Sequence, residues 1–293
     1  MFQMKLSESK VMTKFKCRPL YGILSAWLLL ANGVHAQYQG NYQSGEFGIQ
    51  AGAAHYFGDL NTTSKLNQPH PAFGVFFRKQ LNNYAALRLA VNYSTLSYSD
   101  KLQFQNEFQR RRNLDFKTTL WELILQGDFN FFKFNPMNPY ERFTPYLTFG
   151  VGAFYYNPYT FLDGTKYYLR PLGTEGQNTV KSNSKEYSSL AVCLPIGFGI
   201  KWNVSKKMNM HFEITHRFTT TDFIDDVSGN YVGSDAFFSE TPAFYLQDRS
   251  YETGTPIGIE GSQRGFKGNK DQYIMASFGI TFNFTAYRCP GYN

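Results

Sequence analysis

The sequence predicts an all-β protein, an eight-stranded antiparallel transmembrane β-barrel with short periplasmic turns and long extracellular loops. Three observations lead to this fold class: an export signal at the N-terminus, a composition rich in aromatic residues and glycine, and eight segments with period-2 alternation of apolar residues. Single-chain bacterial barrels have an even number of strands, and closure of the sheet leaves no exposed edge.

The first 36 residues have the layout of a cleaved signal peptide. Their basic stretch contains Lys5, Lys10, Lys14, Lys16 and Arg18. An apolar run over residues 20–31 and short side chains at residues 34–36 follow, and the run is too short to span a bilayer. We therefore expect residues 1–36 to be removed and residues 37–293 to form the outer-membrane β-barrel domain.

Most of the excess positive charge belongs to this leader. The whole chain has 29 basic and 22 acidic residues, and removal of five Lys/Arg and one Glu leaves 24 and 21. No basic stripe remains of the kind that binds nucleic acid, so no nucleic-acid partner is expected.

The composition suits a barrel but does not by itself exclude another fold. Aromatic residues make up 18% of the chain, the mean hydropathy is −0.39, and no 18-residue apolar segment follows the leader. A transmembrane barrel has this composition, and so does a secreted β-sandwich.

The alternating segments favour the barrel because they are long enough to cross a membrane as tilted strands. In 143–155 the odd positions are mostly apolar, and in the segment that ends at Trp202 the even positions are apolar. The even positions of 274–284 repeat the pattern. The other five segments lie near residues 45–57, 72–80, 84–97, 117–133 and 207–218.

The connections between these segments alternate in length. Residues 81–83, 134–141 and 203–207 form short turns, whereas residues 57–71, 98–116, 156–187 and 219–271 form long loops. Short turns at one end and long loops at the other are typical of outer-membrane barrels, and a sandwich gives no reason for this regularity.

An eight-stranded barrel has an interior that side chains can fill. The inward positions predict a lumen charge network of four cations and three anions, which would pair because an unpaired buried charge is costly. A charged plug is the favoured interpretation, with an ion path as the alternative and a general porin excluded. The predicted members are Arg78, Arg88, Glu122, Asp128, Lys201, Glu213 and Arg217.

No set of residues predicts a catalytic site, a metal site or a cofactor. His211 lies on the inward face near Glu213, a spacing more typical of a packed polar pair than of a catalytic dyad. The acidic residues of the last long loop lack the ligand spacing of a known calcium loop. These residues are Asp222, Asp225, Asp226 and Asp235, and we expect them to cap turns or to pair with Arg217, with calcium binding left open.

Two cysteines remain after the leader, and they are not expected to form a disulfide. Cys193 faces the lumen, whereas Cys289 follows the last strand. A bond between them would require the C-terminal tail to fold back into the barrel.

Five ordered motifs resemble the PorG-like family of outer-membrane barrels, a component of the type IX secretion system. They are `GEFGIQAGAAHYFGDLN` (45–61), `TPYLTFGVGAFYYNP` (144–158), `RPLGTEGQ` (170–177), `TTTDFIDDVSGNY` (219–231) and the closing `YRCPGY` (287–292). The resemblance spans nearly the whole chain after the leader. It implies a non-enzymatic anchor in outer-membrane lipid for a periplasmic ring, made of a lipoprotein and its partner of the PorK/PorN type. It also implies that Arg288, Cys289 and Pro290 contact this ring.

Two other functions remain as alternatives. Long aromatic-rich outer loops favour a small structural or adhesion-type barrel that binds a surface partner. A lipid-modifying enzyme is the third possibility. The last loop is long, and PorG-like barrels form a broad family, so a paralogue without a secretion role would carry the same motifs.

Overall fold

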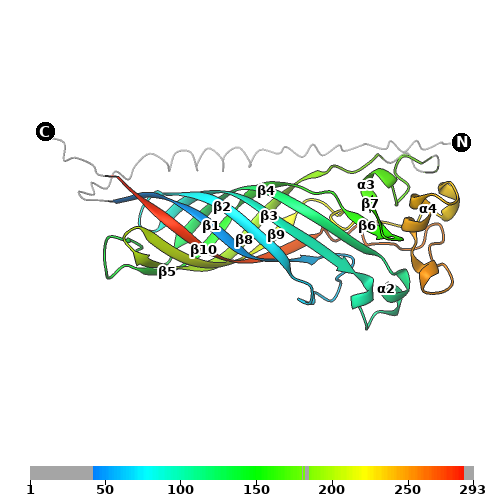
Figure 1. Cartoon of the computed structure of the whole chain (residues 1–293), viewed down its shortest axis with the longest axis horizontal. Coiled ribbons are helices and arrows are strands. Elements are labelled where there is room, and N and C mark those ends of the chain that lie inside the picture. The colour runs from blue at the N-terminus through cyan, green and yellow to red at the C-terminus, as the bar shows by residue number, and fades with distance from the viewer. Residues whose placement is uncertain (1–41, 180, 182–184, 287–293) are drawn as a thin grey trace, which may run out of the picture. The chain divides into compact units, whose positions relative to one another are not determined.

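The computed structural model describes residues 42–179, 181 and 185–286 (Figure 1). The predicted signal peptide and the predicted contact residues Arg288, Cys289 and Pro290 lie outside these residues. Eight long strands are present: β1 (Tyr42–Phe57), β2 (His70–Gln80), β3 (Ala85–Ser99), β4 (Asp115–Asn130), β5 (Phe143–Tyr155), β8 (Leu190–Ser205), β9 (Met208–Thr219) and β10 (Gln272–Ala286).

The eight strands close into one antiparallel barrel. Each long strand pairs with the next long strand along the chain, and β1 pairs with β10 from Tyr42 opposite Ala286 to Phe57 opposite Gln272. The pairing of β3 with β4 completes the circle. The predicted fold class is therefore confirmed, and the sandwich alternative is wrong because a sandwich does not close.

The long connections contain more regular structure than the sequence predicted. Strands β6 (Tyr159–Leu162) and β7 (Thr165–Tyr168) form a hairpin beside β4. The connections also contain the short helices η1 (Asp100–Leu102), α2 (Glu107–Arg112), α3 (Leu169–Leu172), η2 (Ser234–Ala236), α4 (Pro242–Gln247) and η3 (Ser250–Glu252). None of the described helices is long and apolar enough to cross a membrane.

Strand boundaries differ from the prediction by up to three residues, for example at the end of β4. This strand ends at Asn130 rather than at residue 133. The backbone N–H of Phe134 then bonds the carbonyl of Asn83, and the Phe134 side chain is buried. The N–H of Phe131 still bonds the carbonyl of Pro145 in β5, and the chain turns inward across the barrel end only at Phe134.

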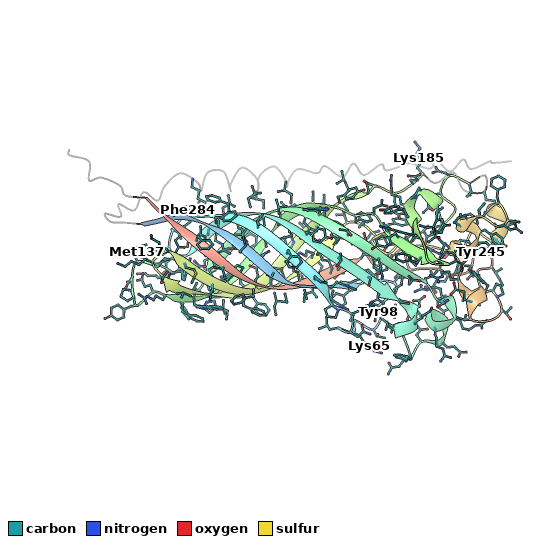
Figure 2. The ribbon with its side chains drawn as sticks, in the orientation of Figure 1. Lys65, Tyr98, Met137, Lys185, Tyr245 and Phe284 are labelled. Carbon is teal, nitrogen blue, oxygen red and sulfur yellow. The ribbon has the colours of Figure 1, made fainter. Side chains whose placement is uncertain are left out.

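Short turns and long connections lie at opposite ends of the barrel, as Figure 1 shows. The turn end carries the connections β2–β3, β4–β5 and β8–β9, with Met137 and Phe284 labelled there in Figure 2. The loop end carries the four long connections, where Lys185 and Tyr245 are labelled. We call the described residues of these connections (58–69, 100–114, 156–189 and 220–271) the cap.

The outward face of the strands is an apolar belt. Leu123, Leu125, Phe149 and Ile196 all point outward and are about half exposed, and the same pattern runs around the barrel. At the loop side the belt ends in aromatic residues such as Trp121. Soluble proteins do not expose a continuous apolar surface of this size, whereas a lipid-facing band flanked by aromatic residues is the design of outer-membrane barrels. The protein is an outer-membrane barrel.

Glycines on the inward face make room for large inward side chains. A Cβ atom on Gly48 would lie 2.3 Å from the ring of Phe76, and one on Gly279 would lie 2.2 Å from the ring of His211. Small residues opposite large ones allow a narrow barrel to be filled without voids.

Candidate functional site

The centre of the lumen is an ion-pair network around Asp128. The Asp128 carboxylate lies 2.6 Å from Nε of Arg78, 3.5 Å from Nη2 of Arg88 and 3.5 Å from Nζ of Lys201. Arg78 also donates to Glu46 at 2.6 Å. All of these side chains are buried. One carboxylate is thus in contact with three cations in a site with almost no access to water.

A second set of pairs lies closer to the cap. Arg88 contacts Glu213 at 2.7 Å, and the hydroxyl of Tyr146 donates to the same carboxylate at 2.6 Å. Arg217 contacts Glu122 at 3.3 Å, so Arg217 does not pair with the acidic residues of the last loop. That part of the prediction is wrong, because Arg217 points into the lumen toward β4.

All seven predicted lumen residues lie in the interior, and the structure adds Glu46 as an eighth. Glu46 accepts from Asn209 at 2.9 Å and from Thr281 at 2.5 Å, besides its contact with Arg78. The network then has four cations and four anions. The period-2 pattern of β1 contained the signal for Glu46, because it alternates with the outward residue Phe47.

The cap-side half of the lumen contains an apolar cluster, which packs beside the Arg217–Glu122 pair. Buried side chains of the strands pack there against Leu169, Ile224, Val227 and Leu246 of the cap. The strand residues of this core include Tyr56, Leu96, Phe116, Leu120, Phe154, Cys193 and Met275. Side chains therefore fill the interior from the charged network up to the cap.

We expect no steady ion current through this lumen, because ion-paired and apolar side chains fill it. Purified protein in a planar bilayer in 1 M KCl should give no stepwise conductance at either polarity. A porin added later to the same bilayer is the positive control. Reproducible steps before that addition would contradict the plug and favour the ion path.

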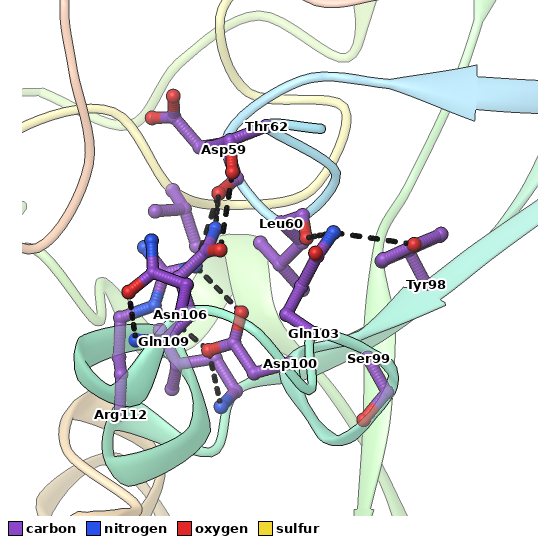
Figure 3. Close-up of polar contacts among 12 residues, drawn as sticks. Asp59, Leu60, Thr62, Tyr98, Ser99, Asp100, Gln103, Asn106, Gln109 and Arg112 are labelled. Carbon is purple, nitrogen blue, oxygen red and sulfur yellow. Dashed lines mark hydrogen bonds and ion pairs between the residues drawn. The ribbon is translucent and has the colours of Figure 1, made fainter. Parts of the chain in front are cut away.

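Polar contacts hold the β1–β2 loop against the β3–β4 connection (Figure 3). Gln109 and Arg112 of α2 donate to the backbone carbonyl of Asp59, at 2.8 and 3.1 Å. Arg112 also forms an ion pair with Asp100 at 2.7 Å. Gln103 donates to the carbonyl of Leu60 at 3.2 Å. The two connections form one structured unit at the loop end.

The cap also contains a buried acidic cluster over the end of β1. The hydroxyl of Tyr56 donates to Asp225 at 2.5 Å and lies 3.1 Å from Asp271. Asp222 accepts from Ser228 at 2.7 Å, and its other carboxylate oxygen is buried without a hydrogen bond. Burial, together with the neighbouring carboxylates, raises the pKa of Asp225 and Asp271 well above the usual range.

Asp226 faces a different set of partners from Asp225. Its carboxylate accepts from Tyr187 at 2.7 Å and from Thr174, and it lies 3.8 Å from Arg264. Arg264 contacts Glu175 at 3.0 Å. The fourth predicted acidic residue, Asp235, is distant from this cluster and pairs with Lys181 at 2.5 Å on the surface.

The described residues contain no group of three or more His, Cys, Asp or Glu side chains that could hold a metal ion. The acidic residues accept hydrogen bonds from Tyr, Ser and Thr hydroxyls and from backbone N–H groups instead. Asp225 therefore caps a turn through the N–H of Val227, as the sequence predicted, whereas Asp222 and Asp226 accept from side-chain hydroxyls.

His211 and Glu213 do not contact each other. His211 lies 3.4 Å from Gln50, whereas Glu213 binds Arg88 and Tyr146. The packed polar pair that the sequence favoured at this position is therefore wrong, because each side chain has other partners across the lumen.

The structure does contain one serine–histidine pair that the sequence did not indicate. Ser97 Oγ lies 2.6 Å from His70 Nε2, and Gln68 donates to the same hydroxyl at 3.1 Å. Ser97 is buried, and no carboxylate within the described ranges contacts His70 to orient the ring. A hydrolytic site needs an accessible nucleophile and an oriented base, so this pair fits a structural contact between the start of β2 and β3, to which Gln68 of the β1–β2 loop adds.

Cys193 is buried in the lumen as a free thiol, as its inward position predicted. Its predicted lack of a bond to Cys289 stays a prediction, because Cys289 lies outside the described residues.

Known structures with a similar form are small outer-membrane proteins. Neisserial surface protein A has a TM-score of 0.41 and 10% identity, over 84% of this chain and 100% of that one. The attachment invasion locus protein Ail of Yersinia pestis, in complex with the heparin analogue sucrose octasulfate, has a TM-score of 0.38 and 10% identity, over 82% of this chain and 99% of that one. OprG from Pseudomonas aeruginosa has a TM-score of 0.30 and 13% identity, over 83% of this chain and 96% of that one. Likenesses at these values carry no functional information.

No curated protein matches the chain. Residues 25–239 match the family described as Domain of unknown function (DUF6089), a span that includes β1 to β9 and the first part of the cap. The chain belongs to the DUF6089 family.

Proposed function

We propose that this protein is a non-enzymatic outer-membrane barrel that anchors a periplasmic assembly through its turn end. The resemblance to PorG-like barrels identifies the assembly as the PorK/PorN-type ring of the type IX secretion system. The observation that carries the proposal is a preorganised turn end with exposed apolar side chains.

Backbone hydrogen bonds join the three turns to one another. The N–H of Asn130 bonds the carbonyl of Tyr84 at 2.6 Å, and that of Phe134 bonds the carbonyl of Asn83 at 3.2 Å. The N–H of Asn203 bonds the carbonyl of Arg142 at 2.7 Å. A partner that binds the turn end therefore meets a surface that loses little conformational entropy on binding.

Three large apolar or aromatic side chains are exposed at the turn end, and Tyr140 is exposed more than any residue of the apolar belt. Tyr140 is 94% exposed, Leu81 61% and Phe132 56%. Aromatic side chains commonly provide much of the energy of a protein interface. The same turns carry the basic residues Lys133, Lys206 and Lys207. An acidic or polar surface on the partner would complement this end of the barrel.

We expect the turn variant Leu81→Ser/Tyr140→Ser to lose the ring while the wild type retains it. The measurement is a pull-down of tagged protein in mild detergent, with purified ring lipoprotein and its partner as the prey. Loss of two central apolar contacts should weaken binding by about 2–4 kcal/mol, or roughly 30-fold to 1000-fold. A chain truncated after Thr285 tests the tail separately.

The matched control is Phe104→Ser/Phe238→Ser, which removes two exposed apolar side chains at the loop end. Loss of the ring by the turn variant alone supports anchoring through the turns, and loss by the truncation alone moves the contact to the tail. If the wild type itself does not bind the ring, the anchor role is wrong.

An adhesion-type barrel is the second candidate, favoured by the surface of the cap. Phe238 is 88% exposed and Phe104 is 77% exposed at the loop end. Phe238 also lines a cavity of about 470 Å³ between residues 171–181 and 235–243. A cap variant that reduces attachment of cells to a surface, with the ring still bound, would support this second role.

A further inference from the structure

We propose that the outward face of the β6–β7 hairpin binds the phosphate-bearing headgroups of the outer-leaflet lipid. This hairpin face consists of Lys117 of β4 together with Tyr159, Phe161, Lys166 and Tyr168. The site is separate from the turn end, so its test is independent of the anchor role.

The strand register places these five side chains on the lipid side. Lys117 of β4 points outward, on the same face as Trp121, and it pairs with Tyr159. Paired residues of antiparallel strands face the same side of a sheet. Tyr159 pairs with Tyr168, and Phe161 pairs with Lys166, so the whole set continues the outward face of β4.

The hairpin face lies at the level of the lipid headgroups. Lys117 is four residues beyond Trp121, which corresponds to about 13 Å along the strand and about 9 Å along the membrane normal for a tilt near 45°. The headgroup layer is roughly 5–8 Å thick on each side of the hydrocarbon core. An exposed Trp at the end of the apolar belt marks the start of that layer, so the backbone of Lys117 lies at its outer edge. The long lysine side chain can extend back from there toward the phosphates.

Aromatic rings hold the two ammonium groups in place. Lys166 Nζ lies 3.8 Å from the ring centre of Tyr159 and 4.6 Å from that of Tyr168, and it donates to the Tyr168 hydroxyl at 3.1 Å. Lys117 Nζ lies 5.6 Å from the ring centre of Phe161. Cation–π contacts orient a cation without cancelling its charge.

This positive charge is not neutralised by the protein. Neither Lys117 nor Lys166 forms an ion pair with a carboxylate in the part of the chain that the structure describes. Asp115, the acidic residue of β4 nearest to Lys117 on the outward face, is paired with Arg249. Two fixed cations beside a lipid surface have an anionic headgroup as their complementary partner.

The test measures lipid preference beside Trp121. The substitutions Trp27→Phe and Trp202→Phe leave Trp121 as the one tryptophan of the chain. This protein is refolded into vesicles that contain phosphatidylcholine with either brominated phosphatidylglycerol or brominated phosphatidylcholine. Quenching of Trp121 by each brominated lipid gives the relative affinity of the anionic headgroup.

We expect a preference for phosphatidylglycerol that falls about fivefold for each lysine removed and disappears in Lys117→Gln/Lys166→Gln. Addition of 1 M salt should reduce the preference for phosphatidylglycerol of the protein that keeps both lysines. The matched control Lys101→Gln/Lys185→Gln removes the same charge from exposed positions of the cap outside the hairpin face, and it should keep the preference. Heat-dependent electrophoretic mobility verifies folding of each variant.

An unchanged preference in Lys117→Gln/Lys166→Gln would overturn the proposal. An equal loss in the control would overturn it too, because general charge would then explain the preference. Inorganic phosphate at 50 mM in low-salt buffer distinguishes a free-anion site: if it removes the preference more than chloride of equal ionic strength does, the site binds free phosphate and the lipid assignment is wrong.

Discussion

Replacing Asp128 by asparagine should destabilise the barrel by about 3–5 kcal/mol, the range for removing one partner of a buried ion pair. Asp128 contacts Arg78, Arg88 and Lys201, and the substitution removes the negative charge that they share. Arg78 keeps Glu46 and Arg88 keeps Glu213. The greatest loss therefore falls on Lys201.

Without Asp128, the groups that Lys201 contacts directly are neutral, and Glu46 interacts with it only at longer range. It donates to Asn130 at 3.1 Å, and its ammonium group lies 4.4 Å from the ring centre of Tyr146. The double variant Asp128→Asn/Lys201→Met should consequently regain part of the lost stability, since it removes one buried charge of each sign. Asp163→Asn, in the exposed turn of the β6–β7 hairpin, is the matched control and should change stability by less than about 0.5 kcal/mol.

The measurement is the free energy of unfolding in guanidinium chloride, followed by tryptophan fluorescence of protein refolded in vesicles. A loss below about 1 kcal/mol for Asp128→Asn would show that water or a neighbouring group replaces the carboxylate. Absence of any recovery in the double variant would show that Lys201 does not depend on Asp128.

The barrel was predictable because its physical cause is local. Lipid on one side and a packed lumen on the other impose a period of two on every strand, and the segment 143–155 was predicted with the bounds of β5. The same period assigns inward charges such as Arg78 and Asp128. It does not say which charges pair, because that depends on the register between strands.

The cap was much less predictable from sequence. Tyr56 and Asp225 are 169 residues apart and meet only because irregular backbone folds over the barrel end. One element did carry a local signal: Asp163 and Gly164 have φ angles of 50° and 78°, and an Asp-Gly pair between alternating residues is typical of a tight hairpin turn. The turn of the β6–β7 hairpin therefore carries a recognisable local signal in the sequence.

Raising the pH from 4.5 to 7.5 should loosen the cap while the barrel stays folded. Burial raises the pKa of Asp226, Asp222 and Asp59 to about 6, from an ordinary value of 3.8. Because the folded pKa exceeds the unfolded one, the stabilisation is complete below about pH 4 and is lost as the pH rises through 6. Asp225 and Asp271, whose pKa values are also raised, act in the same direction.

The difference between the folded pKa of about 6 and the ordinary value of 3.8 sets how much stability the cap loses. For Asp226, which is buried, the loss is on the order of 3 kcal/mol, and it is smaller for Asp222 and Asp59. Burial raises the pKa of Asp226. The neighbouring Arg264 and the hydrogen bonds from Thr174 and Tyr187 lower this pKa, but by less than burial raises it. The charged groups around the wider cluster are Glu175, Arg112, Lys267 and Lys270.

Hydrogen exchange, corrected for the intrinsic effect of pH, measures this loosening. Amides of residues 220–271 should lose protection by roughly 25-fold between pH 4.5 and 7.5 from Asp226 alone, the equivalent of about 2 kcal/mol, while those of β8 and β9 stay constant. Asp226→Asn should make the amide protection depend less on pH, because a neutral amide takes the place of the protonated acid at every pH. Asp235→Asn, on the surface beside Lys181, should leave it unchanged. Protection that is constant or rises with pH would mean that these carboxylates are ionised in the folded cap and that solvent, rather than protein, surrounds them.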